Sequence, residues 1–141
     1  MTLSSATITF KKLTPNLLVA NVERSLAFYA DVLGFARGMT VPEESPFVFA
    51  SVVSGTVEIF LNDRDTGIKE YPAFGGMPLG ATATMFIEVE GPGHIDPLYD
   101  RLKSRVAVTM PIVTQWYGSR EFAIADPDGY LITFAERVPQ S

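Results

Sequence analysis

The chain has 141 residues, a net charge of −5 and an isoelectric point of about 4.8. This length suits one ordinary domain, and 47% hydrophobic against 19% charged residues is the balance of a folded chain rather than a disordered one. Because the acidic balance works against binding of a polyanion, we expect no nucleic-acid partner. The negative charge serves solubility or attracts a cationic ligand.

Missing residue types exclude several kinds of site. The sequence contains no cysteine, so disulfides, thiolate metal sites and cysteine nucleophiles are excluded. His94 is the only histidine, which rules out a metal site of two histidines and one carboxylate within one chain. No serine near it stands in the turn that a nucleophilic serine needs, so we expect a surface histidine. Residues 1–12 lack a signal-peptide pattern and no apolar run approaches the ~18 residues that span a membrane, so we expect a cytoplasmic protein.

The first half of the chain predicts a strand, a helix and three more strands. Residues 13–19 are rich in Leu and Val and predict the first strand. Asn21 is a helix N-cap, and Gly34 is able to end the helix with a positive φ. The apolar stripe between them has the spacing of one helix face: Val22, Leu26, Tyr29 and Leu33.

Three further strands are predicted at 35–40, 47–53 and 56–61, and Ser54-Gly55 is interpreted as a two-residue hairpin turn between the last two. Residues 62–80 are rich in Gly, Pro and Asp. They predict a loop that links two halves of the chain and covers a site as a flap.

The second half repeats this order. Strands are predicted at 81–89, 106–109, 121–125 and 130–135, with a helix at 94–103 that presents Leu98 and Leu102 on one face. Asp126 to Gly129 has the preferences of a type I turn. The halves align with an offset of 70 residues, so we expect an α+β fold. A single domain over residues 1–141 would hold two tandem β-α-β-β-β modules at about 11–62 and 81–138, joined by a linker at about 63–80. They would form a curved mixed sheet with a concave cup and with helices on its outer face.

Strand alternation assigns side chains to the two faces of each hairpin. With the turn at Ser54-Gly55, the first hairpin carries a purely aliphatic face for a helix and a mixed face for the cup. With Ala125 paired to Tyr130, the last hairpin divides in the same way, although a bulge would swap its faces. The mixed faces comprise Phe47, Phe49, Ser51, Glu58 and Phe60, and Arg120, Phe122, Ile124, Leu131 and Thr133.

These mixed faces indicate a small-molecule pocket with an aromatic lining and few polar groups. The alternative is that the aromatic side chains are ordinary core. Glu58 is an ionised carboxylate among phenylalanines, which is costly unless it is paired or solvated. It therefore either forms a salt bridge with Arg120 or Arg37, or serves the ligand site as a partner for a cation or as a general base.

Two stretches resemble a known superfamily. Residues 13–35, LTPNLLVANVERSLAFYADVLGF, resemble the opening of the vicinal oxygen chelate superfamily, which includes glyoxalase I, extradiol dioxygenases, fosfomycin-resistance enzymes and bleomycin-resistance proteins. Residues 116–134, WYGSREFAIADPDGYLITF, resemble the bleomycin-resistance branch in particular. The resemblance implies the two-module fold, and it implies a metal-free homodimer whose cup and groove sequester a cationic, partly aromatic antibiotic.

The metal ligands of the superfamily's enzymes fall on residues of this chain that coordinate poorly. Following the resemblance, the four ligand positions are Thr14, Glu58, Ala83 and Thr133. Alanine coordinates nothing and threonine hydroxyls are poor ligands for Zn, Ni, Mn or Fe. We therefore expect no metal and no cofactor.

The sequence leaves three hypotheses for function. The first is a metal-free protein that binds a small cationic or aromatic compound. The second is an enzyme of the same superfamily, a lyase, isomerase or dioxygenase-like member, that works without the usual metal and uses Glu58 as its base. The third is a metal enzyme with displaced ligands. The ligand-binding residues expected for the first are Phe47, Phe49, Ser51, Glu58, Phe60, Met85, Trp116, Arg120, Phe122 and Thr133.

Overall fold

The computed structural model describes residues 7–139. The first module contains β1 (Asn16–Val19), α1 (Val22–Ala27) with a π-helical turn (Phe28–Val32), β2 (Ala36–Val41), β3 (Phe49–Ser54) and β4 (Val57–Asp63). A connecting segment contains α2 (Arg64–Glu70) and a 3-10 turn (Pro72–Phe74). The second module contains β5 (Thr84–Glu88), α3 (Ile95–Leu102), β6 (Ala107–Thr114), β7 (Ser119–Ala125) and β8 (Leu131–Arg137).

The two modules have the same topology. Their strand orders are β1-β4-β3-β2 and β5-β8-β7-β6, and in each module the first strand runs parallel to the last while the other pairs are antiparallel. This confirms the α+β class and the tandem β-α-β-β-β repeat. The prediction of one curved sheet is wrong, because the modules form two separate four-stranded sheets.

Helix α1 forms as the sequence predicts. The Asn21 side chain accepts a hydrogen bond from the backbone N–H of Arg24 at 2.9 Å, which satisfies one of the donors left open at a helix start. Gly34 has φ of +89° and ends the helical segment. All four residues of the predicted stripe are buried: Val22, Leu26, Tyr29 and Leu33.

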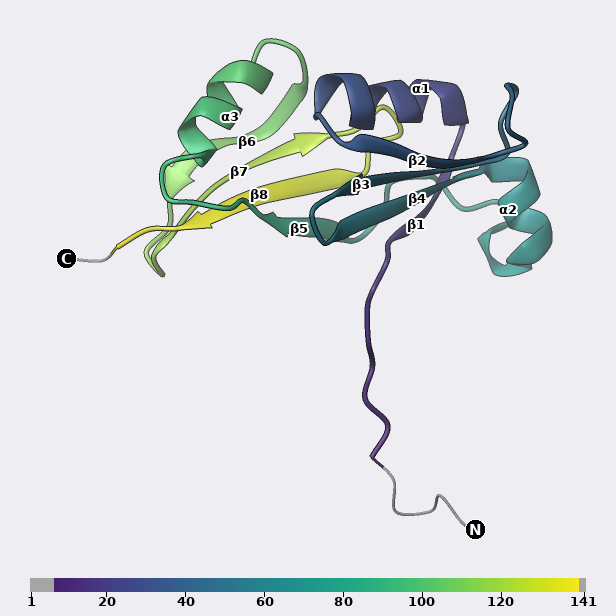
Figure 1. The fold of residues 1–141 in the computed structure, drawn as a ribbon, viewed down its shortest axis with the longest axis horizontal. Helices are drawn as coiled ribbons and strands as arrows, with labels where there is room; N and C mark the ends of the chain where they lie inside the picture. Colours follow the sequence, from purple (N-terminus) through teal and green to yellow (C-terminus); the bar gives the residue numbers. More distant parts are fainter. Residues whose placement is uncertain (1–6, 140–141) are drawn as a thin grey trace.

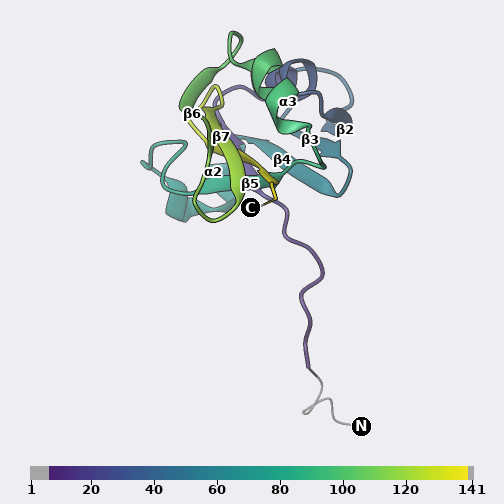
Figure 2. The same cartoon turned by 90° about the vertical axis from the view of Figure 1, so that its left-hand side faces the viewer.

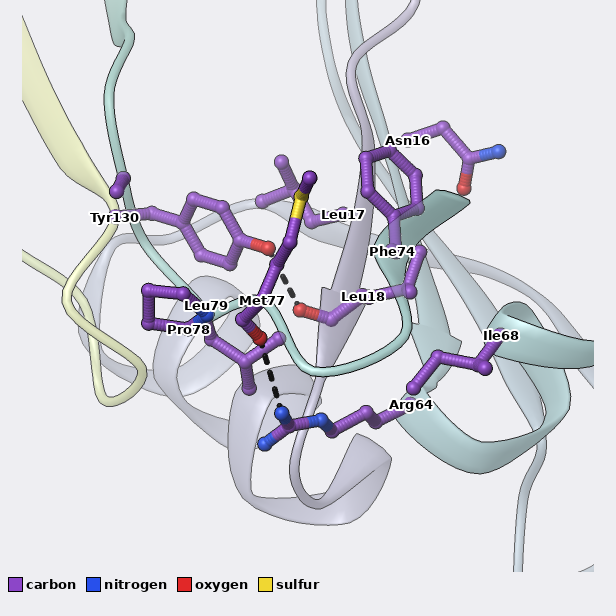
Figure 3. A pocket seen from close by; sticks show the side chains of 11 residues that line it. Asn16, Leu17, Leu18, Arg64, Ile68, Phe74, Met77, Pro78, Leu79 and Tyr130 are labelled. Carbon is purple, nitrogen blue, oxygen red and sulfur yellow. Dashed lines mark hydrogen bonds between the residues drawn. The ribbon is translucent and has the colours of Figure 1, made fainter. Parts of the chain in front are cut away.

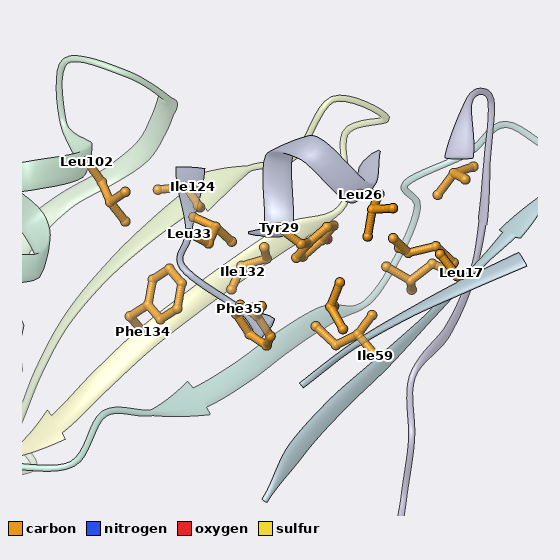
Figure 4. Packing of buried hydrophobic residues seen from close by; sticks show 14 of the residues in the cluster. Leu17, Leu26, Tyr29, Leu33, Phe35, Ile59, Leu102, Ile124, Ile132 and Phe134 are labelled. Carbon is orange, nitrogen blue, oxygen red and sulfur yellow. The ribbon is translucent and has the colours of Figure 1, made fainter. Parts of the chain in front are cut away.

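Helices α1 and α3 lie on the same side of the two sheets (Figure 1). The buried aliphatic side chains of both sheets meet them in one hydrophobic cluster that draws on both modules (Figure 4). From the first sheet it includes Ala50, Val52, Ile59 and Leu61, and from the second Phe122, Ile124, Ile132 and Phe134. The modules are therefore joined by a shared core rather than by strand pairing.

Polar contacts reinforce this joint between the modules. Tyr29 on the first module donates its hydroxyl hydrogen to Asp126 Oδ2 at 2.8 Å, and Arg24 pairs with Asp128 at 2.9 Å. Burial raises the pKa of the Asp126 carboxyl, while the hydrogen bonds from Tyr29 and from backbone N–H groups act in the opposite direction. The turn before β8 is thus anchored to α1.

Helix α3 is held at its start by a carboxylate from β8. Glu136 accepts hydrogen bonds from the backbone N–H groups of Gly93 at 3.0 Å, His94 at 2.8 Å and Ile95 at 3.2 Å. Leu102 of the predicted face is fully buried together with Ile95, while Leu98 is partly buried against the cluster. His94 is exposed, as the sequence predicts.

The connecting segment is more ordered than predicted. It contains α2, which begins where the Asp63 side chain accepts hydrogen bonds from the backbone N–H and the hydroxyl of Thr66, both at 3.1 Å. An aspartate three residues before a threonine forms such a cap even in a Gly-rich and Pro-rich stretch. Close contact of Gly67 with Leu18 packs α2 against β1, because a Cβ there would lie 2.7 Å from the leucine side chain.

Residues 7–14 form an extended arm that projects away from the body of the molecule in both views (Figures 1 and 2). The first strand was predicted from Leu13, but pairing of β1 begins only at Asn16. The arm carries apolar side chains into solvent: Ile8 is 82% exposed, Phe10 93% and Leu13 85%.

Candidate functional site

The sheet faces turned away from α1 and α3 form one side of the molecule, called here the open face. In the first hairpin the turn is Gly55-Thr56 rather than Ser54-Gly55, and Ser54 pairs with Val57. Each residue of β3 therefore pairs two residues further along β4 than predicted. Because side chains alternate with a period of two, their assignment to the two faces is unchanged. Phe49, Ser51, Glu58 and Phe60 are on the open face by register.

The last hairpin differs from the prediction by one residue, which exchanges its faces. Ala125 pairs with Leu131, not with Tyr130. The predicted turn is present, with Gly129 N–H bonded to the Asp126 carbonyl at 3.0 Å, but Asp126 N–H also reaches the Tyr130 carbonyl, and Gly129 has φ of +90°. This is a type I turn followed by a glycine bulge, and the extra residue reverses the alternation.

Arg120 and Phe122 therefore lie on the helix side, and Phe47 of the first module also packs against the core, so the assignment of these three residues to the cup is wrong. Phe122 is fully buried and packs edge-on against Tyr99. Arg120 makes an ion pair with Asp96 of α3 at 2.7 Å. Phe47, which precedes β3, packs against the core while its N–H donates to Glu23 at 2.6 Å. Ile124 is likewise core, and of that face only Leu131 and Thr133 lie on the open side.

A central cavity of about 440 Å³ lies on the open face where the two sheets meet. It is lined by Leu13 and Pro15, by the start of β4 and by β5. Phe86 of β5 lines this cavity and is 56% exposed. The half-buried rings of Phe49 and Phe60 lie on the open face of the first sheet, outside the cavity lining, and stand edge to face with their centroids 5.2 Å apart. Aromatic surface of this kind suits a flat apolar ligand.

Glu58 lines the central cavity and is ion-paired there. Its partner is Lys12 of the arm, at 2.6 Å, rather than Arg120 or Arg37. Arg37 instead pairs with Asp31. The prediction that Glu58 forms a salt bridge is thus confirmed, but its partner is a residue that the sequence did not suggest.

The other predicted site residues lie in different surroundings. Ser51 is buried, and its hydroxyl accepts a hydrogen bond from Met39 N–H at 2.9 Å, so it braces β2. The Thr133 hydroxyl lies 3.3 Å from that of Thr84 on the open face. Met85 packs partly against the core and also lines the central cavity. Trp116 is 88% exposed in the turn before β7 and contacts Tyr117 edge to face.

A second, apolar cavity of about 200 Å³ lies beneath the connecting segment. Figure 3 shows Phe74, Met77 and Leu79 closing over Leu18 and Tyr130. The Tyr130 hydroxyl donates to the Leu18 carbonyl at 2.8 Å, and Arg64 donates to the Met77 carbonyl at 3.0 Å. The segment therefore covers a cavity, as the flap interpretation expected, and it adds lining residues that the sequence did not single out.

The residues at the superfamily's metal positions do not fit a metal ion. They supply one carboxylate, already paired with Lys12, two hydroxyl groups and a methyl group at Ala83. Among residues 7–139 no group of three His, Asp or Glu side chains is placed to hold a metal ion.

Glu121 is a polar residue of the open face that sequence reasoning missed. By register it shares this face with Ala123 and lies opposite Ala135, and it is only 3% exposed. Its Oε1 accepts a hydrogen bond from the Tyr117 hydroxyl at 2.9 Å. The signal was Gly129, because a glycine bulge after the type I turn moves Glu121 to the open face and Phe122 to the core.

Comparison with known proteins identifies the family. Bleomycin resistance proteins from Geobacillus stearothermophilus and Staphylococcus aureus are 34% identical over 134 aligned residues, which cover 88% of this chain and 95% of each relative. A glyoxalase/bleomycin resistance protein/dioxygenase from Nocardioides has the same fold, with a TM-score of 0.76, 23% identity and coverage of 98% and 91% of the two chains. TnmS3, an antibiotic binding protein from Streptomyces sp. CB03234, gives a TM-score of 0.70 at 22% identity, covering 93% and 99%.

The model of one family matches nearly the whole chain, from residue 10 to residue 134. Within residues 7–139 no helix is long and apolar enough to cross a membrane. With the repeated modules and the open face described above, the chain belongs to the glyoxalase/bleomycin resistance protein/dioxygenase superfamily.

Proposed function

We propose that the protein binds a small molecule on its open face and that the ligand is an aromatic or cationic antibiotic held without chemical change. The observation that carries this proposal is the central cavity, which exposed Phe86 lines, while the Phe49–Phe60 pair adds aromatic surface on the open face of the first sheet. The relatives that share 34% identity are bleomycin resistance proteins, and this supports an antibiotic of that class.

The polar groups of the open face suit recognition better than catalysis. Glu58, the candidate general base, is engaged by the Lys12 ammonium, and a base paired in this way is less available to take a proton. The donor set at the superfamily's metal positions supports a metal-free mode of action. The alternative, an enzyme with Glu58 as base, predicts turnover that is lost in Glu58→Gln.

We propose further that the active form is a homodimer in which the arm of one copy pairs with the strand edges that border the central cavity of the other. Within residues 7–139, β1 pairs only with residues 60–63 of β4, so residues 57–59 have a strand on one side alone, and β5 pairs only with β8. These two edges border the central cavity, and residues 7–11 of the arm alternate polar and apolar side chains as a strand would. We also propose a cytoplasmic location, with which a chain that needs no disulfide is compatible.

The experiment is a thermal-shift measurement on metal-stripped protein with bleomycin, with other cationic aromatic antibiotics and with divalent metal ions. A compound that binds only the native state should add about 2.7 kcal/mol of stability at a hundredfold excess over Kd. We expect a shift with a compound and none with Zn, Ni, Mn or Fe. A shift with a metal ion alone would overturn the proposal and point to an enzyme.

A further inference from the structure

We propose that Glu121 anchors the positively charged group of the ligand, in a subsite formed by the second module alone. This inference rests on the proposed function and deepens it, because it names the ligand class as an aromatic compound bearing an ammonium or guanidinium group. It starts from an unsatisfied atom. Glu121 Oε2 is buried, and it is the one such side-chain nitrogen or oxygen without a hydrogen-bond partner in the described part of the chain.

An unsatisfied buried carboxylate oxygen is costly, and proteins rarely keep one that has no use. The other oxygen is satisfied by the Tyr117 hydroxyl. This contact raises the pKa of Tyr117, because the phenol donates a hydrogen bond to the carboxylate and the carboxylate would repel a phenolate. The Glu121 side chain is therefore fixed through Oε1, and Oε2 retains its full capacity to accept.

A cavity of about 110 Å³ on the open face is lined by direct neighbours of Glu121, although Glu121 itself lies behind this lining. Its lining includes Tyr117, which holds the carboxylate, Ser119, which precedes Glu121 by two residues on the same strand, and Ala135, which is the cross-strand partner of Glu121. Phe86 lines both this cavity and the central one. A ligand whose charged group is bound at Glu121 would thus place its aromatic part against Phe86 and in the central cavity.

The chemistry of this subsite favours a cation. A carboxylate only accepts hydrogen bonds, whereas an ammonium group only donates them. The rings of Phe86 and Tyr117 add cation–π attraction at the entrance, and the Glu88 carboxylate lines the same cavity. Arg137 lines it as well and would attract an anion instead. Since an anion would meet the buried carboxylate, we expect Arg137 to remain at the rim.

Three indole compounds test the charge preference directly: tryptamine, which is a cation, tryptophol, which is neutral, and indole-3-acetate, which is an anion. Binding is followed by two-dimensional NMR of ¹⁵N-labelled full-length protein, through the backbone amides of Ser119, Glu121 and Ala135. We expect tryptamine to bind at least about tenfold more tightly than the other two, because a charge-assisted hydrogen bond contributes roughly 1.5–3 kcal/mol. Equal affinities, or a preference for indole-3-acetate, would overturn the inference.

The variant that isolates the residue is Glu121→Gln, which keeps the size of the side chain and removes its charge. We expect it to fold with unchanged or increased stability and to lose the preference for tryptamine over tryptophol. The matched control is Glu70→Gln, which removes an exposed carboxylate of α2 that lines neither cavity and should change the preference by less than about twofold. A Glu121→Gln protein that still prefers tryptamine would refute the assignment.

The two proposals fail in different ways. If bleomycin and the other antibiotics do not bind but tryptamine discriminates through Glu121, the subsite stands and the antibiotic class is wrong. If bleomycin binds wild-type protein and Glu121→Gln equally well, the binding function stands and Glu121 is not its anchor.

Discussion

Single carboxylates in this protein have distinct tasks that follow from what surrounds them. Glu136 accepts hydrogen bonds from three backbone N–H groups at the start of α3 and stabilises that helix end. Glu121, in contrast, has one oxygen without a hydrogen-bond partner on the open face. Asp126 is buried and ties the two modules together through Tyr29. Contacts with backbone donors and with Tyr29 give Glu136 and Asp126 structural roles, whereas Glu121, with one oxygen left unpaired, is the carboxylate that we propose for binding.

The cap at α3 makes stability depend on pH in a defined direction. Hydrogen bonds from backbone N–H groups, that of Gly93 foremost, lower the pKa of Glu136. Since the folded-state pKa is below the unfolded one, the stabilisation is present above the ordinary glutamate pKa and is lost as the pH falls through the folded-state value. We expect Glu136→Gln to cost about 1 kcal/mol at neutral pH, with the difference from wild type closing in acid.

Urea unfolding across a pH series measures this effect. Glu90→Gln serves as the control, because Glu90 lies exposed just before this helix start and should show no such dependence. A constant difference between wild type and Glu136→Gln at every pH would contradict the capping role.

Among the elements, the connecting segment depends on glycines at its end. Gly80 has φ of +85°, and a Cβ there would lie 2.7 Å from the Asp128 carbonyl oxygen, so the segment passes directly over the turn before β8. Gly76 has a similar φ of +79° but open space around it. Comparing substitutions at Gly76 and Gly80 therefore distinguishes the cost of backbone strain from the cost of steric contact.

We expect Gly76→Ala to destabilise the protein by about 1–2 kcal/mol through left-handed backbone strain alone. Gly80→Ala should cost clearly more, because its methyl group also meets backbone atoms that cannot move aside, and it should disturb the cavity beneath the segment. The free energy of unfolding of both variants, measured in urea, provides the comparison. Equal losses would show that the segment does not depend on this close passage.

Much of the fold could be predicted at the level of elements, because local signals suffice for it. The Asn21 cap, the apolar stripe of α1 and the 70-residue repeat are all visible in the sequence. The site was harder, because faces depend on register. In the first hairpin the predicted register was wrong by two residues, which leaves each side chain on its predicted face. In the last hairpin one bulge residue at Gly129 shifts the register by one, so Glu121 rather than Phe122 lies on the open face. Helix α2 was missed because its cap lies within a stretch of loop-like composition.

At the scale of the whole molecule, the arm predicts association. Ile8 and Phe10 are among its most exposed apolar side chains, and exposure of such groups is costly unless a partner covers them. We expect wild-type protein to be a dimer at micromolar concentrations and the double variant Ile8→Ser/Phe10→Ser to be a monomer. Light scattering after gel filtration measures both, with Lys11→Ser as the control in the same arm. A monomeric wild-type protein would refute the arm-exchanged dimer.

The lack of strand pairing between the two sheets has a mechanical consequence. Within the described residues no ladder of hydrogen bonds joins β4 to β5, and the modules meet through the shared core and through side-chain hydrogen bonds such as that from Tyr130 to the Leu18 carbonyl. A small rotation of one sheet against the other would therefore widen or narrow the central cavity without breaking any strand pairing. We therefore expect the width of the central cavity to adjust to ligands of different thickness while both sheets keep their strand pairing.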